Sequence, residues 1–122
     1  MNFHYESLDH VQVASPKGTE EQARDFYMNK LGFKELEKPD TLKGNGGVWF
    51  QAGTVHIHIG VEEPFIPAKK AHPAIRVKNL DALKEHLSNV KIDFIVDDRL
   101  PGAKRFYVSD PFENRIEFLE WD

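Results

Sequence analysis

Residues able to bind a metal ion stand on stretches that alternate apolar and polar side chains. His10 lies in LDHVQVA, His56 and His58 lie in VHIHI, His72 lies in AHPAIRV and Glu117 lies in RIEFLE. Such alternation predicts β-strands whose polar and apolar side chains point to opposite faces. Neutral imidazoles and a carboxylate are ligands that Zn²⁺, Fe²⁺, Mn²⁺, Co²⁺ or Ni²⁺ accept. The polar faces of these strands therefore carry the chemistry of a divalent metal site.

The positions of these residues repeat along the chain. His10 and His72 are 62 residues apart, and His56 and Glu117 are 61 residues apart. If a pseudo-twofold relates the two halves of the chain, these four side chains point into one cleft. His10, His72 and Glu117 are the best candidates for metal ligands, followed by His56, which His58 can replace because both share a strand face. Two histidines and one carboxylate leave coordination positions open for water and substrate, as catalysis requires.

Each of these residues has a simpler interpretation when it is taken alone. A histidine on a strand is usually a surface residue or a hydrogen-bonded core residue, and a glutamate on an exposed face is usually solvated. The coincidence of positions under the repeat favours the metal site over that interpretation. His4 lies near the terminus and His86 lies on a polar helix face, so we interpret both as solvent-exposed residues.

Further candidates for substrate contact lie on the same strand faces. Arg76, Arg105 and Tyr107 are positioned to hold an anionic group, because arginine pairs bidentately with carboxylate or phosphate. The alternative is that both arginines are surface groups paired with nearby acids. Trp49 and Phe50 alternate, so one is expected in the core and the other at the pocket. The candidate substrate-binding residues are Gln12, Trp49, His58, Arg76, Arg105 and Tyr107.

The elements that must position these residues occur twice in the same order. In the first half, alternation predicts strands over residues 8–14, 33–36, 48–51 and 55–59. A helix follows the first of them, from a capping box at Thr19 and Gln22 to a stop at Gly32. Residues 62–70, a polar stretch with two prolines, are expected to form a linker.

The second half restarts this order after the linker. Strands are predicted over residues 72–77, 94–96, 104–108 and 115–120, with a turn at Asp110–Pro111. Asn79 is expected to cap a helix between the first two of these strands. A β-α-β-β-β order with a period of about 60 residues indicates two similar modules. We therefore expect one α+β domain over residues 1–122, with a first module at about 6–61 and a second at about 71–121.

Composition narrows the class of protein. The 122 residues are 40% hydrophobic and include nine phenylalanines, enough for one core. Sixteen basic and 20 acidic residues give a net charge of −4 with no basic stripe, which argues against nucleic-acid binding. No apolar run approaches the length of a membrane span, and the first eight residues do not resemble a signal peptide. The absence of cysteine excludes disulfides and thiolate chemistry and suits a cytoplasmic protein.

At this point the sequence resembles the vicinal oxygen chelate superfamily, also called the glyoxalase/bleomycin resistance/dioxygenase superfamily. The resemblance is carried by LDHVQVA, ARDFYMNKLGF, VWFQAGTVHIHIG, AHPAIRV and RFYVSDPFENRIEFLE, which span nearly the whole chain. It implies paired βαβββ modules that form a cupped mixed sheet around a metal cleft. Most small members are homodimers, so the resemblance also implies a homodimer.

The resemblance assigns ligands residue by residue. The histidine of the first strand matches His10, that of the second module matches His72, and the terminal carboxylate matches Glu117. Where glyoxalase I carries a glutamate on the last strand of the first module, His56 stands here, which departs from the four-ligand site of that enzyme. The resemblance implies one divalent ion, with Glu117 as both ligand and catalytic base.

Two functions of different classes follow. One is a divalent-metal-dependent lyase, isomerase or oxygenase acting on a small oxygenated metabolite or xenobiotic. The other is a metal-free protein of the bleomycin-resistance type that sequesters a small molecule between the subunits of a dimer. Both take a small-molecule ligand, and neither requires nucleic acid or a membrane.

Overall fold

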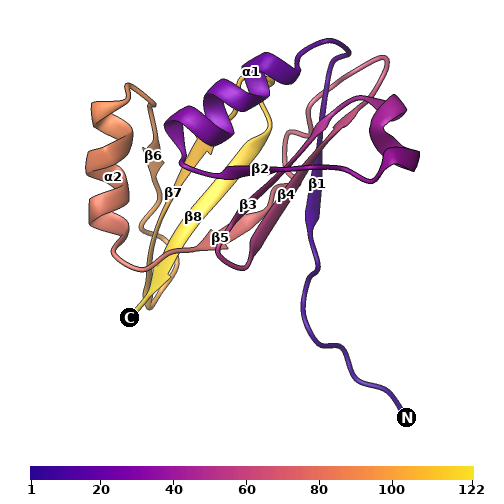
Figure 1. The fold of residues 1–122 in the computed structure, drawn as a ribbon. Coiled ribbons are helices and arrows are strands. Elements are labelled where there is room, and N and C mark those ends of the chain that lie inside the picture. The colour runs from indigo at the N-terminus through magenta and orange to yellow at the C-terminus, as the bar shows by residue number, and fades with distance from the viewer.

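Two four-stranded mixed sheets form the framework of the protein in a computed structural model that describes all 122 residues (Figure 1). The first sheet has the order β1-β4-β3-β2, with β1 (Val11–Ser15), β2 (Lys34–Leu36), β3 (Val48–Ala52) and β4 (Val55–Val61). The second sheet has the matching order β5-β8-β7-β6, with β5 (Ala74–Arg76), β6 (Ile95–Val96), β7 (Ala103–Ser109) and β8 (Arg115–Trp121). β1 pairs in parallel with β4 in the first sheet, and β5 pairs in parallel with β8 in the second. All other neighbouring strands are antiparallel. The predicted α+β architecture is confirmed.

The two strands predicted to carry His10 and His72 are shorter than predicted. β1 begins at Val11, which pairs with Ile57 on β4, and β5 begins at Ala74, so His10 and His72 lie just before their strands. Pro73 lacks a backbone N–H and cannot donate to a ladder. The residues before His10 are exposed and extend away from the body of the molecule (Figure 1).

The first helical segment differs from the predicted helix. α1 (Glu20–Arg24) continues as a π-helix, η1 (Asp25–Lys30), and the segment stops before Gly32, whose φ is 83°. The predicted capping box is wrong, because the Thr19 hydroxyl donates to the Pro16 carbonyl at 2.6 Å and makes no cap hydrogen bond.

Of the two remaining helices, the sequence pattern predicts one and not the other. α2 (Leu80–Asn89) begins as predicted, since the Asn79 side chain accepts a hydrogen bond from the Ala82 N–H at 3.2 Å. A short 3-10 helix, η2 (Asp40–Asn45), lies between β2 and β3. None of the helices has the length and apolar character required to span a membrane.

A single apolar core joins the two modules. Fifteen buried residues from both sheets and both main helices form one contiguous cluster. Its largest members include Tyr27, Phe50, Ile57, Leu87 and Phe106. The apolar sides of both sheets therefore contribute to one core together with the helices, and their histidine-bearing faces lie on the opposite sides.

The turn between β7 and β8 connects the two modules through side-chain hydrogen bonds. Asp110 Oδ1 accepts hydrogen bonds from the backbone N–H groups of Phe112 (2.9 Å) and Asn114 (2.8 Å). Asp110 Oδ2 accepts from the Tyr27 hydroxyl at 2.8 Å and from Asn114 Nδ2 at 2.9 Å, and Asn114 Nδ2 also donates to the Ala14 carbonyl at 2.7 Å. Burial raises the pKa of Asp110 and that of Tyr27. The sequence predicts a turn here, whereas the structure makes it the polar link between the two halves.

Candidate functional site

Strand register decides which residue of the first module is the counterpart of Glu117. If His10 is matched to His72, Gln12 is matched to residue 74, because both lie two positions further on. Gln12 pairs with His58 on β4, and Ala74 pairs with Glu117 on β8. The counterpart of Glu117 is therefore His58 rather than His56, which lies two residues earlier on the same strand face. The two modules have segments of different lengths, so counting residues shifts the match.

His58 lies at the centre of a stack of three rings. Its ring centroid lies 4.0 Å from that of Trp49 and 4.0 Å from that of His10, with interplanar angles of 6° and 15°. His10 is exposed, and its Nδ1 lies 2.8 Å from Asp9 Oδ1. His58 is only 7% exposed, and burial, together with the neighbouring His10, lowers its pKa to about 4. His58 is therefore neutral at pH 7, which is the form that binds a metal ion.

Glu117 and His72 form the second pair. His72 Nε2 lies 2.9 Å from Glu117 Oε1, and His72 Nδ1 lies 2.8 Å from the Lys70 carbonyl oxygen. Because a carbonyl only accepts, Nδ1 carries a proton and the ring orientation is fixed. The Tyr107 ring meets His72 edge-on at 5.5 Å. Glu117 is buried, with Arg105 Nη1 at 3.7 Å from its Oε2.

Asp97 holds Arg105 beside Glu117. Asp97 Oδ2 lies 3.3 Å from Arg105 Nη2 and 2.6 Å from Arg99 Nη2, and Arg99 holds the pKa of Asp97 well below its usual range. Arg105 is mostly buried, so the interpretation as a surface arginine is wrong although its pairing with acids is confirmed.

Arg76 is exposed and makes no ion pair. The sequence did not single out Asp97 or Arg99; alternation from Ile95 to Asp97 could have placed Asp97 on this face.

The remaining candidates lie on the two polar faces. Gln12 extends its side chain over Gly60, where an added Cβ would meet Gln12 Nε2 at 2.6 Å. Trp49 belongs to the ring stack, and its neighbour Phe50 is fully buried in the core. Tyr107 is the cross-strand partner of Glu117. Gln12 and Trp49 therefore lie next to the first pair, and Tyr107 lies next to the second.

Within one chain the two pairs do not combine into a single centre. No three His, Asp or Glu side chains lie close enough to hold one metal ion. The expectation that His10, His72 and Glu117 converge within one chain is therefore wrong. The physical reason is that the pairs stand on separate sheets, which share a core on their apolar sides. Each polar face carries half of the predicted ligand set.

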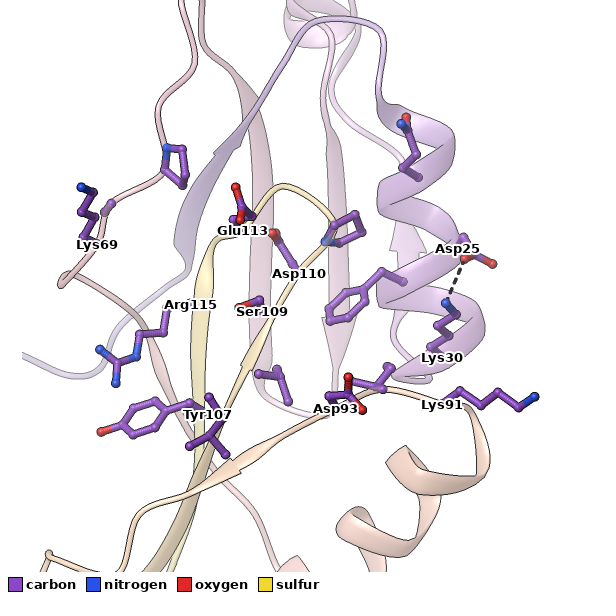
Figure 2. A pocket seen from close by; sticks show the side chains of 18 of the residues that line it. Asp25, Lys30, Lys69, Lys91, Asp93, Tyr107, Ser109, Asp110, Glu113 and Arg115 are labelled. Atoms are coloured by element: carbon purple, nitrogen blue, oxygen red, sulfur yellow. Dashed lines mark ion pairs between the residues drawn. The ribbon is translucent and has the colours of Figure 1, made fainter.

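A broad groove of about 1230 Å³ is lined in part by Tyr107, which contacts His72 of the second pair. Figure 2 shows side chains that line this groove. Its walls come from α1 and η1, the linker, the segment before β6, strand β7 and the Asp110 turn. Tyr107 and Arg115 line it, whereas neither member of the His10–His58 or His72–Glu117 pair does. Figure 2 shows the Arg115 guanidinium against the Tyr107 ring at one side of this groove.

Comparison with known proteins defines the class. The sequence profile of the Glyoxalase/Bleomycin resistance protein/Dioxygenase superfamily matches residues 7–118, and the chain belongs to this superfamily. A crystal structure of a putative glyoxalase family protein from Bacillus anthracis is 51% identical, covers all of both chains and superposes with a TM-score of 0.96.

Two more distant similarities are to a curated plant protein and to a solved bacterial structure. Glyoxylase I 4 of Arabidopsis thaliana is 24% identical over 98% of this chain and 74% of its own length. TnmS3, an antibiotic binding protein from Streptomyces sp. CB03234, has a TM-score of 0.72 at 20% identity, covering 97% of this chain and all of its own. At such identities the likeness to TnmS3 concerns the fold alone.

Proposed function

We propose that the protein is a divalent-metal-dependent lyase, isomerase or oxygenase acting on a small oxygenated metabolite or xenobiotic. In this proposal the chain forms a homodimer, and His10 and His58 of one copy meet His72 and Glu117 of the other. The observation that carries the proposal is the register match between the two pairs. Two matched half-sites that are separate within one chain are what a symmetric dimer would complete twice.

The chemistry of the donor set fits a divalent transition metal. Three imidazoles and one carboxylate suit Zn²⁺, Fe²⁺, Mn²⁺, Co²⁺ or Ni²⁺. His58 is neutral at pH 7, and the carbonyl of Lys70 fixes the proton of His72 on Nδ1. A hydrogen-bonded second nitrogen is the usual support of a metal-ligating histidine. When bound, the ion would stabilise negative charge on two neighbouring substrate oxygens.

Glu117 is the proposed base. Its carboxylate is buried beside His72 and Arg105, so it is held in one orientation at the end of a positioned side-chain network. In the proposed reaction Glu117 takes a proton from the substrate carbon next to the chelating oxygens and later returns it. Arg105, held by Asp97, offsets the negative charge of the Glu117 carboxylate and restricts its movement. Trp49, on the opposite half-site, would exclude water from one side.

Complementation between variants tests both parts of the proposal. The untagged protein, reconstituted with Zn²⁺, Mn²⁺, Co²⁺ or Ni²⁺, is expected to bind about one ion per chain by elemental analysis. His58→Ala and Glu117→Ala are each expected to bind none, while the exposed-terminus control His4→Ala binds as the wild type does. Co-expression of the two defective chains is expected to restore about a quarter of an ion per chain, because half of the dimers carry one intact site.

The outcomes separate the possibilities. A wild-type protein that binds none of these ions contradicts the metal-dependent enzyme. Wild-type binding that co-expression does not restore contradicts a site built from two copies. The Glu117→Gln variant tests the base: unchanged turnover of a true substrate would remove Glu117 from that role.

One observation favours a second function, a metal-free binding protein. The stack of Trp49, His58 and His10 leaves an outer ring face at each end, against which a planar compound can stack without any metal. TnmS3 shows that this fold occurs in an antibiotic binding protein. A wild-type protein that binds a planar compound with equal affinity in EDTA and after metal reconstitution would support this function.

A further inference from the structure

Arg115 has donors that no acidic side chain uses. It is half-buried at the start of β8 and makes neither an ion pair nor a side-chain hydrogen bond. Its guanidinium carbon lies 3.9 Å from the centroid of the Tyr107 ring. The ring covers one face of the planar guanidinium, so the N–H groups along its edge stay free while the group is held in one orientation. The arrangement is that of a positioned cation without its anion.

The location of Arg115 relates it to the proposed catalytic pair. Arg115 and Glu117 are two residues apart on one strand, so they share a face and lie about 7 Å apart along it. Tyr107 is the cross-strand partner of Glu117 and also contacts His72. Arg115 therefore stands one side-chain position from Glu117 on the same strand face. It also lines the groove, next to Tyr107 (Figure 2).

The neighbouring arginines are already engaged. Arg105 lies between Asp97 and Glu117, and Arg99 is paired with Asp97. A ligand that paired with the Nε–Nη2 edge of Arg99 or with the Nη groups of Arg105 would compete with a carboxylate that is already there. Arg115 can accept an anion with no such exchange, and the unpaired hydroxyl of Tyr107 adds a second donor on the same wall.

We propose that Arg115, oriented by Tyr107, binds an anionic oxygen group of the substrate. This inference rests on the proposed function and narrows it. The substrate class is a small compound that carries a carboxylate or a phosphate in addition to its two chelating oxygens. A planar guanidinium edge recognises either group through paired N–H···O bonds.

Two hydroxamates that share a chelating head test the proposal. Acetohydroxamate presents two adjacent oxygens and no charged tail, whereas succinic monohydroxamate adds a carboxylate. By calorimetry on the metal-loaded protein, we expect the carboxylated ligand to bind about tenfold or more tightly than acetohydroxamate. Arg115→Gln is expected to abolish this preference while leaving acetohydroxamate affinity and metal content unchanged. Lys104→Gln, which removes one positive charge from the opposite face of β7, is expected to keep the preference.

A second measurement does not depend on a bound metal. Inorganic phosphate, titrated into the metal-free protein, is expected to shift the Arg115 Nε–Hε resonance with millimolar saturation, and Arg115→Lys should weaken the binding severalfold. Failure of both hydroxamates to bind contradicts the proposed function, and this titration then decides the anion site alone. An equal preference in wild type and Arg115→Gln, or an Arg115 resonance unmoved by phosphate, would overturn the proposal.

Discussion

Replacing Tyr27 by phenylalanine isolates the polar link between the two modules. The change removes only the hydroxyl that donates to Asp110 Oδ2 at 2.8 Å, inside a site where both side chains are buried. A hydrogen bond to a charged group contributes about 1.5–3 kcal/mol. Asp110 keeps three other donors, from Phe112 and Asn114, so the lower half of that range applies. We expect Tyr27→Phe to lower the free energy of unfolding by about 1.5–2 kcal/mol.

Urea unfolding followed by circular dichroism measures this loss. The midpoint should fall with an unchanged m-value, and Tm should drop by about 6–8 °C in a chain of this length. Tyr5→Phe is the matched control, because Tyr5 is 93% exposed and makes no hydrogen bond. All variants are compared at one protein concentration, since association would shift apparent stability. A loss below about 0.5 kcal/mol, or one equal to that of Tyr5→Phe, would refute the reasoning.

Two further perturbations follow from the first module. Gly47 has a φ of 83°, and an added Cβ would lie 2.1 Å from the Ile59 carbonyl oxygen, so Gly47→Ala should cost about 2–4 kcal/mol in urea unfolding. Gly53→Ala, with a φ of 58° but open space around it, should cost about 1 kcal/mol, and equal losses would contradict the clash. The pKa of His58 falls from 6.5 to about 4 on folding, so below pH 6.5 the unfolded chain binds the proton first. The free energy of unfolding of the metal-free protein should therefore fall between pH 6.5 and pH 4, by at most about 1.4 kcal/mol per pH unit. The His58→Gln variant should show a smaller decline. An identical decline in the variant would exclude His58 as its source.

The sequence predicts the fold well where local chemistry decides it. Alternation and the repeated order of elements indicate both sheets, and the Asn79 cap and the stop at Gly32 are correct. The Thr19 cap fails because its hydroxyl has a nearer acceptor, the Pro16 carbonyl, which the capping pattern does not consider. The π-helical turn after Arg24 places Phe26 and Tyr27 in the shared core, and the apolar spacing that predicts a helix does not distinguish it from an α-helical turn.

The candidate site is less predictable because long-range register determines it. Counting residues pairs His56 with Glu117, but the strand ladders pair His58 with it, and no local pattern reports the lengths of the intervening segments. The pairing of Asp97 with Arg105 arises from the way β6 and β7 meet. The separation of the histidines into two half-sites follows from the side on which the sheets pack, which alternation alone leaves open.

The shared core determines how the chain can be divided. A backbone cut within residues 62–70, where no helix or strand is broken, would leave two fragments. Each fragment would expose its share of the common hydrophobic core. Such fragments should reassemble on mixing and refold only together, as the halves of a split reporter do. A half-length chain made alone should aggregate, because neither half can bury its apolar side without the other.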